Sequence, residues 1–269
     1  MSNLALTAAQ LRYTNKAFWR NPASAFFTFA FPLMFLVIFT SLIKGDIRIG
    51  ELNLEVDLAT YFVMAEAAFG IISACYTNIA ISVSFHRDQG ILKRTRGTPL
   101  PAWSYLSARV IHSMIIGAIL VVITVVFGIA FYSAEAPTGV PLLQFLLTLV
   151  VGSLSFAALA LALTVVIPNA DASPAIVNAS ILPLLFLSGI FVPIGNDAPA
   201  WIRTVSNIFP VRHFFVAMAS SFLGNVTART SAGSVRALPW DWSDLLIVAA
   251  WGLAGLAIAA RFFSWEPRK

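Results

Sequence analysis

The stretch "LATYFVMAEAAFGIISACYTNIAISVSF", residues 58–85, runs directly into "HRDQGILKRTR", residues 86–96, and this junction decides the class of the protein. The first part is long and apolar enough to cross a bilayer as a helix, which takes roughly 20 residues. The second part gathers charge at one internal point of a chain in which only 11% of residues are charged. The pair predicts a membrane-spanning helix that ends in a charged surface segment.

Long apolar runs recur along the whole chain, which is 59% hydrophobic. Soluble domains are nearer half apolar and about a quarter charged. We expect six transmembrane helices, at about residues 26–43, 58–85, 111–132, 142–167, 175–193 and 245–263. Helices are required because lipid cannot satisfy loose backbone polar groups. The sequence therefore predicts an all-α integral membrane protein, with residues 1–269 forming a single transmembrane domain.

The basic residues predict the orientation of these spans. They precede the first span, follow the second and follow the last: Arg12, Lys16 and Arg20; Arg87, Lys93, Arg94, Arg96 and Arg109; Arg261, Arg268 and Lys269. The other basic residues fall mostly in the long segment 194–244, and the positive-inside rule discounts long loops. We therefore expect a multi-pass protein of the plasma (inner) membrane with both termini in the cytosol. The net charge of +5 then reports orientation and predicts no nucleic-acid partner.

Residues 1–25 form a predicted amphipathic helix on the membrane surface. Apolar residues recur every seven positions and basic residues every four, namely Leu4, Leu11 and Phe18, and Arg12, Lys16 and Arg20. At 100° per residue the two sets lie on different faces. The helix serves either as a basic anchor that sets topology or as a contact for a cytosolic partner.

The segment between the last two spans, residues 194–244, contains its own apolar stretch, Phe209–Leu223. That stretch is short for a span and favours a re-entrant or interfacial helix on the outer side. If it crossed the membrane instead, the C-terminal basic residues would move outside, against the charge rule.

Span 58–85 carries one acid at membrane depth, Glu66. Counted by 100° steps, Ser73, Thr77 and Ser84 fall on nearly the same face, so a polar seam is predicted. Ionisable residues at depth usually face protein or water. The seam lines either a substrate path or a subunit interface, unless its hydroxyls simply bond within their own helix or to a neighbouring one.

Several kinds of chemistry have no sequence signal here. There is no G-x-x-x-x-G-K-[ST] loop, so we expect no ATPase activity and no nucleotide site in this chain. The histidines, His86, His112 and His213, are scattered, and Cys75 is the single cysteine. These residues predict no metal site, no intrachain disulfide and no cofactor bound by this chain.

Two stretches resemble permeases of the ABC-2 type transporter family. The first is "RDQGILKRTRGTPLPAWSYLSAR", residues 87–109, where the matching positions are Asp88, Gly90, Leu92, Arg94, Thr98, Pro99 and Leu106. The second is "LPLLFLSGIFVPIGNDAPAWIRTVSNIFPVRHFFVAM", residues 182–218, where they are Ser188, Gly189, Phe191, Pro193, Pro199, Trp201 and Pro210. His86 departs from the pattern, in which many relatives carry an acid. The likeness covers nearly the whole chain.

The resemblance implies a function and partners. Two permeases, identical or different, would pair in the membrane and bind separate ABC ATPase subunits that hold ATP and Mg. The segment after the second span would be the coupling helix, with Asp88, Gly90, Ile91, Leu92, Lys93, Arg94, Thr98 and Pro99 meeting the ATPase. The N-terminal helix would be a second contact. The substrate path would run between the permeases, with the second and fifth spans contributing.

The function expected is therefore that of a permease subunit of an ATP-driven exporter, moving a drug, antibiotic or lipid-like substrate out of the cytosol or inner leaflet. Some relatives export polysaccharide instead. A proton- or ion-coupled carrier that uses Glu66 is one alternative, although such carriers often show inverted repeats and none is visible here. A membrane scaffold that transports nothing is another. For the charged stretch itself, the alternative to a docking surface is a signal for topology alone.

Overall fold

A computed structural model describes residues 3–42, 46–49, 54–97, 100–134, 136–194, 198–224, 228–229, 235–236 and 240–266. Thr98 and Pro99 of the predicted coupling segment, and Arg268 and Lys269 of the C-terminal basic cluster, lie outside the described residues.

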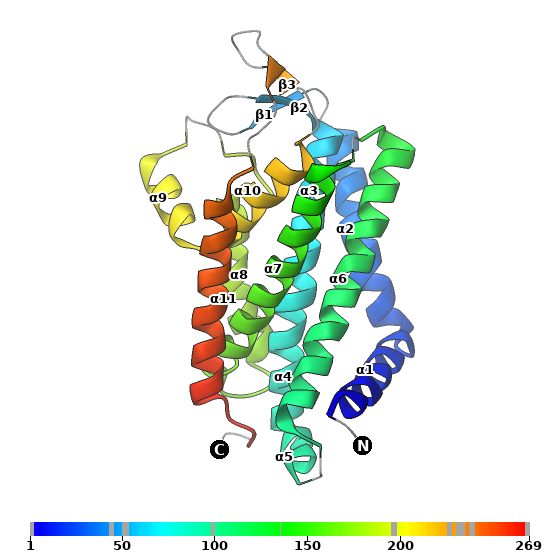
Figure 1. Cartoon of the computed structure of the whole chain (residues 1–269), viewed down its shortest axis with the longest axis vertical. Helices are drawn as coiled ribbons and strands as arrows, with labels where there is room; N and C mark the ends of the chain where they lie inside the picture. Colours follow the sequence, from blue (N-terminus) through cyan, green and yellow to red (C-terminus); the bar gives the residue numbers. More distant parts are fainter. Residues whose placement is uncertain are drawn as a thin grey trace.

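The described chain is a bundle of helices capped at one end by short strands (Figure 1). The helices are α1 Asn3–Trp19, α2 Pro22–Leu42, α3 Leu58–Ile72, α4 Asn78–Asp88, α5 Ile91–Arg96, α6 Ala102–Tyr132, α7 Val140–Leu163, α8 Ser173–Ser188, α9 Ala200–Ile208, α10 Pro210–Phe222 and α11 Trp242–Phe262. A π-helical turn, η1 Ser73–Thr77, joins α3 to α4. In Figure 1, α1, α5 and the last turn of α11 lie at one end, called the α5 end below, and the strands lie at the other, the sheet end.

Four short strands at the sheet end were not predicted from the sequence. They are β1 Asp46–Ile49, β2 Leu54–Asp57, β3 Ala228–Arg229 and β4 Val235–Arg236. They pair antiparallel in the order β1-β2-β3-β4, with Ile49 opposite Leu54 and Glu55 opposite Arg229. The sheet thus joins the segment before α3 to the segment before α11. Each strand contains only two to four residues, too few to produce a distinct pattern of hydropathy.

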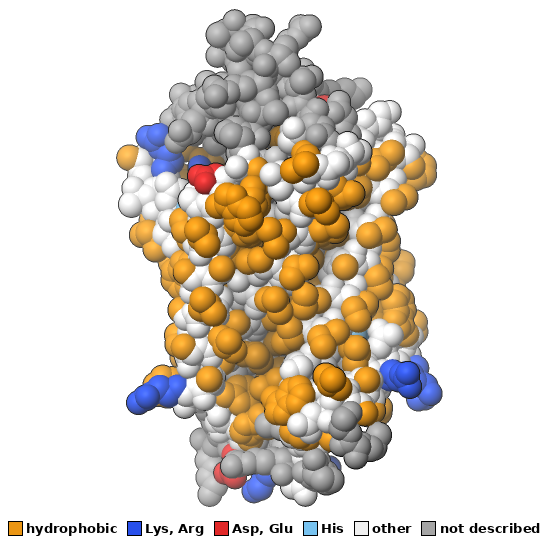
Figure 2. Space-filling model, viewed as in Figure 1, with side chains coloured by type: hydrophobic (Ala, Val, Ile, Leu, Met, Phe, Trp, Pro, Cys, Tyr) orange, Lys and Arg blue, Asp and Glu red, His pale blue; other side chains and the backbone are white. Residues whose placement is uncertain are grey.

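Five helical segments of the described chain are long and apolar enough to cross a membrane. They are Pro22–Leu42, Leu58–Asp88, Trp103–Tyr132, Val140–Leu163 and Trp242–Phe262. The expected fifth span corresponds to α8, which is apolar but has only 16 residues. Helix α6 begins at Ala102, well before the expected span 111–132, because a helix can continue past the apolar part that hydropathy detects. Figure 2 shows hydrophobic side chains over the middle of one face and charged groups towards its two ends.

The segment α3–η1–α4 is the centre of the bundle. Of its apolar window 89% is buried, against 17% for α2. Small residues let α7 approach α11 and α10 closely. A Cβ at Gly252 of α11 would lie 2.7 Å from Ser155 Cα, and one at Gly152 of α7 would lie 2.1 Å from the Phe214 ring of α10. The small residues of the fourth apolar run therefore serve helix packing, as expected for lipid-embedded helices.

Helix α1 packs along α6. Its buried residues are Thr7 and Thr14, whereas Leu4 of the predicted apolar face is 77% exposed. Phe18 packs against Phe29 of α2 and His112 of α6, with ring centroids 6.2 and 5.5 Å apart. Of the predicted apolar set, Leu11 and Phe18 are therefore half-buried and only Leu4 is exposed, while Thr7 and Thr14 are the fully buried residues of α1.

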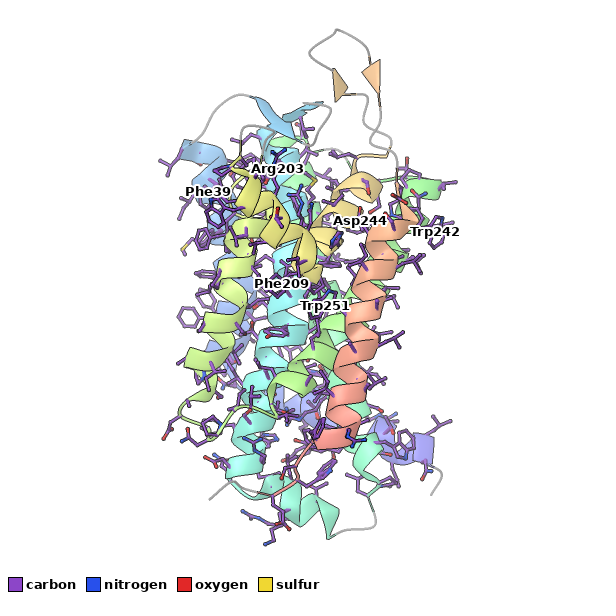
Figure 3. The ribbon with its side chains drawn as sticks, turned by 90° about the vertical axis from the view of Figure 1, so that its left-hand side faces the viewer. Phe39, Arg203, Phe209, Trp242, Asp244 and Trp251 are labelled. Atoms are coloured by element: carbon purple, nitrogen blue, oxygen red, sulfur yellow. The ribbon has the colours of Figure 1, made fainter. Side chains whose placement is uncertain are left out.

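Helix α10 lies inside the sheet end of the bundle. Most of its side chains are buried, and it packs against α3, α7, α8 and α11. Phe209, at the junction of α9 and α10, lies beside Trp251 of α11, and the two rings are stacked 5.9 Å apart (Figure 3).

Candidate functional site

The continuous segment α3–η1–α4, called the central helix below, presents a polar stripe at its π-helical turn. The π-helical turn Ser73–Thr77 inserts an extra residue into one turn, and such turns frequently occur at functional sites. Ser73 and Thr77 are half-buried, and Asn78, directly after the turn, is exposed. Polar side chains at membrane depth usually face protein or a water-filled space. The exposed amide of Asn78 is therefore expected to face protein or water rather than lipid.

A pocket of about 290 Å³ opens beside this stripe, between the central helix, α2 and α6. Ser73, Thr77 and Asn78 line it together with Thr28 and Pro32 of α2. Pro32 has no N–H, so the carbonyl of Thr28, four residues earlier, has no helical donor. The pocket therefore combines two hydroxyls and an amide from one helix with an interrupted backbone on the other.

The other two residues of the predicted seam lie elsewhere. Glu66 and Ser84 are 3% and 0% exposed, and neither lines this pocket. Among the described residues, Glu66 Oε2 and Ser84 Oγ have no hydrogen-bond partner. A count of 100° per residue does not hold across a π-helical turn, so Ser84 rotates away from the side of Ser73 and Thr77. The four residues do not form one continuous surface.

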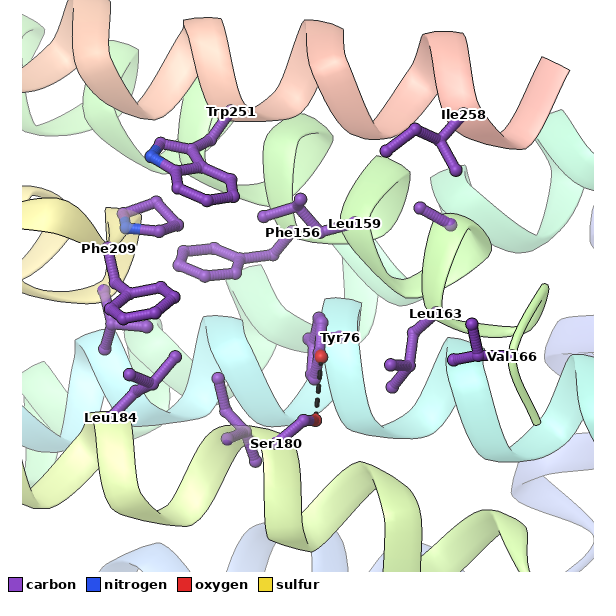
Figure 4. A pocket seen from close by; sticks show the side chains of 14 residues that line it. Tyr76, Phe156, Leu159, Leu163, Val166, Ser180, Leu184, Phe209, Trp251 and Ile258 are labelled. Carbon is purple, nitrogen blue, oxygen red and sulfur yellow. Dashed lines mark hydrogen bonds between the residues drawn. The ribbon is translucent and has the colours of Figure 1, made fainter. Parts of the chain in front are cut away.

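A second, apolar cavity of about 370 Å³ lies on the other side of the central helix (Figure 4). It is bounded by Tyr76, by α7 and α8, by Trp251 and Ile258 of α11, and by the α9–α10 junction. The Tyr76 hydroxyl lies 2.9 Å from Ser180 Oγ of α8 and forms a hydrogen bond with it. Trp251 Nε1 donates to the Ile208 carbonyl at 3.1 Å. These polar groups are paired, so the free surface of the cavity suits an apolar occupant.

Helix α8, the expected fifth span, carries an exposed face whose residues were not predicted from the sequence. Its exposed residues are Pro174, Ala175, Asn178, Ala179, Leu182, Pro183 and Phe186. One polar amide thus lies among small and apolar side chains. Asn78 and Asn178 could have been noticed in the sequence, because each is an amide within an apolar run. The sequence could not predict that both side chains are exposed.

The predicted coupling segment forms a short helix, α5, at the end of the bundle. Gly90 has φ +70°, which L side chains rarely adopt, and it turns the chain from α4 into α5. Leu92 is 0% exposed and belongs to the hydrophobic core, whereas Ile91 is half-buried and Lys93 and Arg94 are exposed. The surface that α5 offers is therefore its charged side, and Leu92 is an internal anchor.

Asp88, another residue of the predicted docking surface, is engaged within the chain. Its Oδ2 accepts a hydrogen bond from the Ala170 N–H at 3.0 Å. The neighbouring Arg87 is 1% exposed and donates to the carbonyls of Thr164 and Ile167, at 2.7 and 2.5 Å. Both residues thus hold the loop between α7 and α8.

A second polar cluster joins α4 to α6 near the same end. The Tyr105 hydroxyl lies 2.6 Å from His86 Nδ1 and accepts from Arg109 Nε at 2.8 Å. Arg109 Nη1 donates to Ser82 Oγ at 3.2 Å. The Trp265 ring packs edge-on against Tyr105, 6.4 Å away. His86, which departs from the family pattern, therefore bonds within the chain.

The basic residues of α1, Arg12, Lys16 and Arg20, are all exposed. At the sheet end, His213 Nδ1 lies 2.6 Å from Asp244 Oδ1, and His213 Nε2 lies 2.9 Å from the Asn207 carbonyl. The hydrogen bond with Asp244 is the main cause that raises the pKa of His213 above its ordinary value. The charged groups of the described chain thus concentrate at the two ends of the bundle.

A helical membrane protein with a short charged helix between two spans is the arrangement found here. The model of the ABC-2 type transporter family matches residues 6–223, and the chain belongs to this family. It is similar to the "Probable multidrug ABC transporter permease YbhR" of Escherichia coli K12, with 25% identity over 182 residues, 68% of this chain and 47% of the relative. The protein of that name in Escherichia coli O157:H7 matches with the same figures. The aligned region thus spans about half the length of these relatives. The family resemblance derived from the sequence is confirmed.

Proposed function

We propose that this chain is the membrane subunit of an ATP-driven exporter and hydrolyses no ATP itself. The observation that carries this proposal is the position of α5. It lies at the tip of the bundle between two long apolar helices, with Lys93 and Arg94 exposed and Leu92 anchored in the core. A soluble motor can hold such a helix, whereas lipid-covered spans offer it little. The ATPase subunit supplies the site for ATP and Mg.

The docking surface consists of the exposed side of α5 and, as a second contact, Arg12, Lys16 and Arg20 of α1. Exposed charges such as Lys93 and Arg94 mainly set the rate and orientation of association. Ile91 is the apolar anchor available to a partner, because Leu92 is buried within the chain. Asp88 contributes through its bond to Ala170 rather than by direct contact.

Six crossings place both termini in the cytosol. A helix of 16 residues is about 24 Å long, somewhat less than a hydrocarbon core of about 30 Å. Together with the residues after Ser188, α8 can complete the sixth crossing. Helix α10, with 13 mostly buried residues, is then the re-entrant element of the outer side. The common position of α1, α5 and the end of α11 supports this topology, as does the excess of basic residues there.

A second permease, identical or homologous, covers the exposed polar faces of the central helix and α8. Asn78 and Asn178 are exposed within apolar helices, and amides in lipid stabilise helix contacts by hydrogen bonds. Ser73 and Thr77 line the pocket next to Asn78 and contribute to the substrate path. The path thus forms between the permeases, with polar groups at its centre.

The substrate is an apolar or amphiphilic molecule such as a drug, an antibiotic or a lipid. The apolar cavity beside Tyr76 supports this class, and so does the name of the Escherichia coli relatives. Polysaccharide, the other substrate class considered, would need a wider hydrophilic lining than these surfaces offer. Membership of the ABC-2 family favours the ATP-driven mechanism over a carrier that uses Glu66, and over a scaffold.

The test is reconstitution in proteoliposomes with an ABC ATPase subunit that co-purifies with this chain. We expect ATP-dependent, vanadate-sensitive movement of an amphiphilic fluorescent dye, and no ATP hydrolysis by the purified chain alone. Vesicles that carry the ATPase without this chain are the control. ATP hydrolysis by this chain alone, or dye movement driven by a proton gradient without ATP, would overturn the proposal.

A further inference from the structure

The last two residues of α4 both reach across to the loop between α7 and α8. Arg87 donates to the Thr164 and Ile167 carbonyls at 2.7 and 2.5 Å, and Asp88 accepts from the Ala170 N–H at 3.0 Å. Sequence positions some 80 residues apart are thus joined by three charge-assisted hydrogen bonds, which are stronger than bonds between neutral groups.

The charges match the helix ends that they meet. Thr164 is the residue after α7, where carbonyls lack helical partners and the helix dipole is negative, so a guanidinium is favourable there. Ala170 lies in the turn that leads into α8, on the positive side of that helix, where a carboxylate is favourable. The planar guanidinium can serve two carbonyls at once, which an ammonium group does less well.

Burial makes this contact stiff. Arg87 is 1% exposed, and Ile167 and Ala170 are 0% and 7% exposed. A buried charge is costly unless its hydrogen bonds are made, so the arrangement tolerates little independent movement of α4 and the loop.

The contact lies directly before α5. Gln89 N–H and Gly90 N–H donate to the carbonyls of Phe85 and Arg87 at 3.0 Å each, and Arg94 Nη2 donates to the Gln89 carbonyl at 3.1 Å. Leu92 is fixed in the core. A force on α5 therefore acts on Arg87 and Asp88 before it reaches the rest of the central helix.

We propose that Arg87 and Asp88 form a clamp that carries movement of α5 into α8, through their hydrogen bonds with the loop of residues 164–172. They are positioning residues for export, and the proposal rests on the proposed function, in which an ATPase displaces α5. The helix that moves, α8, is the one that carries the exposed Asn178 face. A purely structural role for the clamp would lower stability but leave the number of substrates moved per ATP unchanged.

The clamp is tested in the reconstituted complex with the ATPase subunit. Asp88→Ala removes the acceptor, Asp88→Asn keeps an acceptor oxygen, and Arg87→Lys keeps the charge but not the two-carbonyl geometry. Asp171→Ala removes an exposed acid from the same loop and is the matched control. We expect the amount of dye moved per ATP hydrolysed to fall roughly tenfold in Asp88→Ala, as expected for loss of one charge-assisted hydrogen bond. Asp88→Asn should retain more dye movement per ATP than Asp88→Ala. Arg87→Lys should uncouple dye movement from ATP hydrolysis, and Asp171→Ala should move as much dye per ATP as the parent.

A second measurement follows α8 directly. A fluorophore on Ala175→Cys, an exposed position of α8, in a Cys75→Ala background, should respond to vanadate trapping in the parent and lose the response in Asp88→Ala. Failure of the parental complex to move dye with ATP overturns the proposed function. A parent that transports, with an unchanged transport ratio and label response in Asp88→Ala, overturns the clamp alone. If Asp88→Ala does not fold, Asp88→Asn and Arg87→Lys decide by the same two readouts.

Discussion

Arg87 Nη1 lies 2.7 Å from the carbonyl oxygen of Thr164, so an arginine at the end of one span caps the end of another. The arginine is 1% exposed although it belongs to the most charged stretch of the chain. Within that stretch, Arg87 and Asp88 therefore bond to other parts of the chain, whereas Lys93 and Arg94 are exposed.

The first prediction concerns stability. Arg87→Met should lower the thermal unfolding temperature in detergent, because each buried carbonyl left without a donor costs about 1–3 kcal/mol. Arg203→Met, which removes an exposed arginine of α9, should leave the temperature nearly unchanged. Equal unfolding temperatures for the two variants would show that the Arg87 bonds add nothing to stability.

The second prediction concerns topology. In a Cys75→Ala background, single cysteines at Lys93 and Arg203 should react with an impermeant maleimide from opposite sides of the membrane, because α5 and α9 lie at opposite ends of the bundle. Lys93→Cys should label only in inverted vesicles and Arg203→Cys only in intact cells. Labelling of both from one side would contradict the proposed arrangement.

The third prediction concerns the exposed amides. Asn78→Ala and Asn178→Ala should each reduce export roughly fivefold at unchanged expression, as loss of an interhelical hydrogen bond of about 1 kcal/mol would do. Asn178→Cys should also form a disulfide between two permeases if they are identical copies. Val126→Ala, at an exposed apolar position of α6, is the control. If both asparagine variants export at the parental rate, neither Asn78 nor Asn178 contributes to the substrate path.

The fourth prediction concerns Glu66. Its side chain is 3% exposed and lies away from the pocket of Ser73 and Thr77, so Glu66→Gln should export at the parental rate. Glu66→Ala should lower the unfolding temperature, because it leaves a cavity in a packed helix contact. Loss of export in Glu66→Gln at normal expression would instead favour coupling to a proton gradient.

The fifth prediction concerns pH. The hydrogen bond with Asp244, assisted by the Asn207 carbonyl, raises the pKa of His213, while burial and Arg212 oppose the rise. A raised folded-state pKa gives stability that is complete below the ordinary histidine value of 6.5 and is lost as pH rises through the raised value. The unfolding temperature of the parent should therefore exceed that of His213→Gln most below pH 6.5, and the difference should shrink at alkaline pH. A difference that grows with pH would show that the ion pair does not form.

Much of the architecture could be predicted from sequence because it depends on local properties. Apolar runs predicted where the long helices lie, and the charge gathered after residue 85 predicted that the second span ends in a charged surface segment. The motif around Asp88 and Gly90 identified the family, which the comparison confirmed. The four short strands were missed because each contains only two to four residues, and because the pairing of β2 with β3 joins segments far apart in the chain.

The face that each polar residue presents could not be predicted. A regular 100° count placed Glu66, Ser73, Thr77 and Ser84 together, but the π-helical turn Ser73–Thr77 changed the count in the middle. Leu92 and Asp88 were assigned to a partner because they lie in an exposed type of segment, yet one is in the core and the other bonds Ala170.

The sequence by itself determined that this is a helical membrane protein of the ABC-2 type, since hydropathy, charge and motif are properties of neighbouring residues. Only the tertiary structure decided that Arg87 and Asp88 turn inward to the ends of α7 and α8, and that Asn78 and Asn178 stay exposed. The physical reason is that a helix fixes only the angular spacing of its side chains. Which side faces the interior depends on the helices packed around it, and Arg87 finds its carbonyl acceptor 77 positions further along the chain.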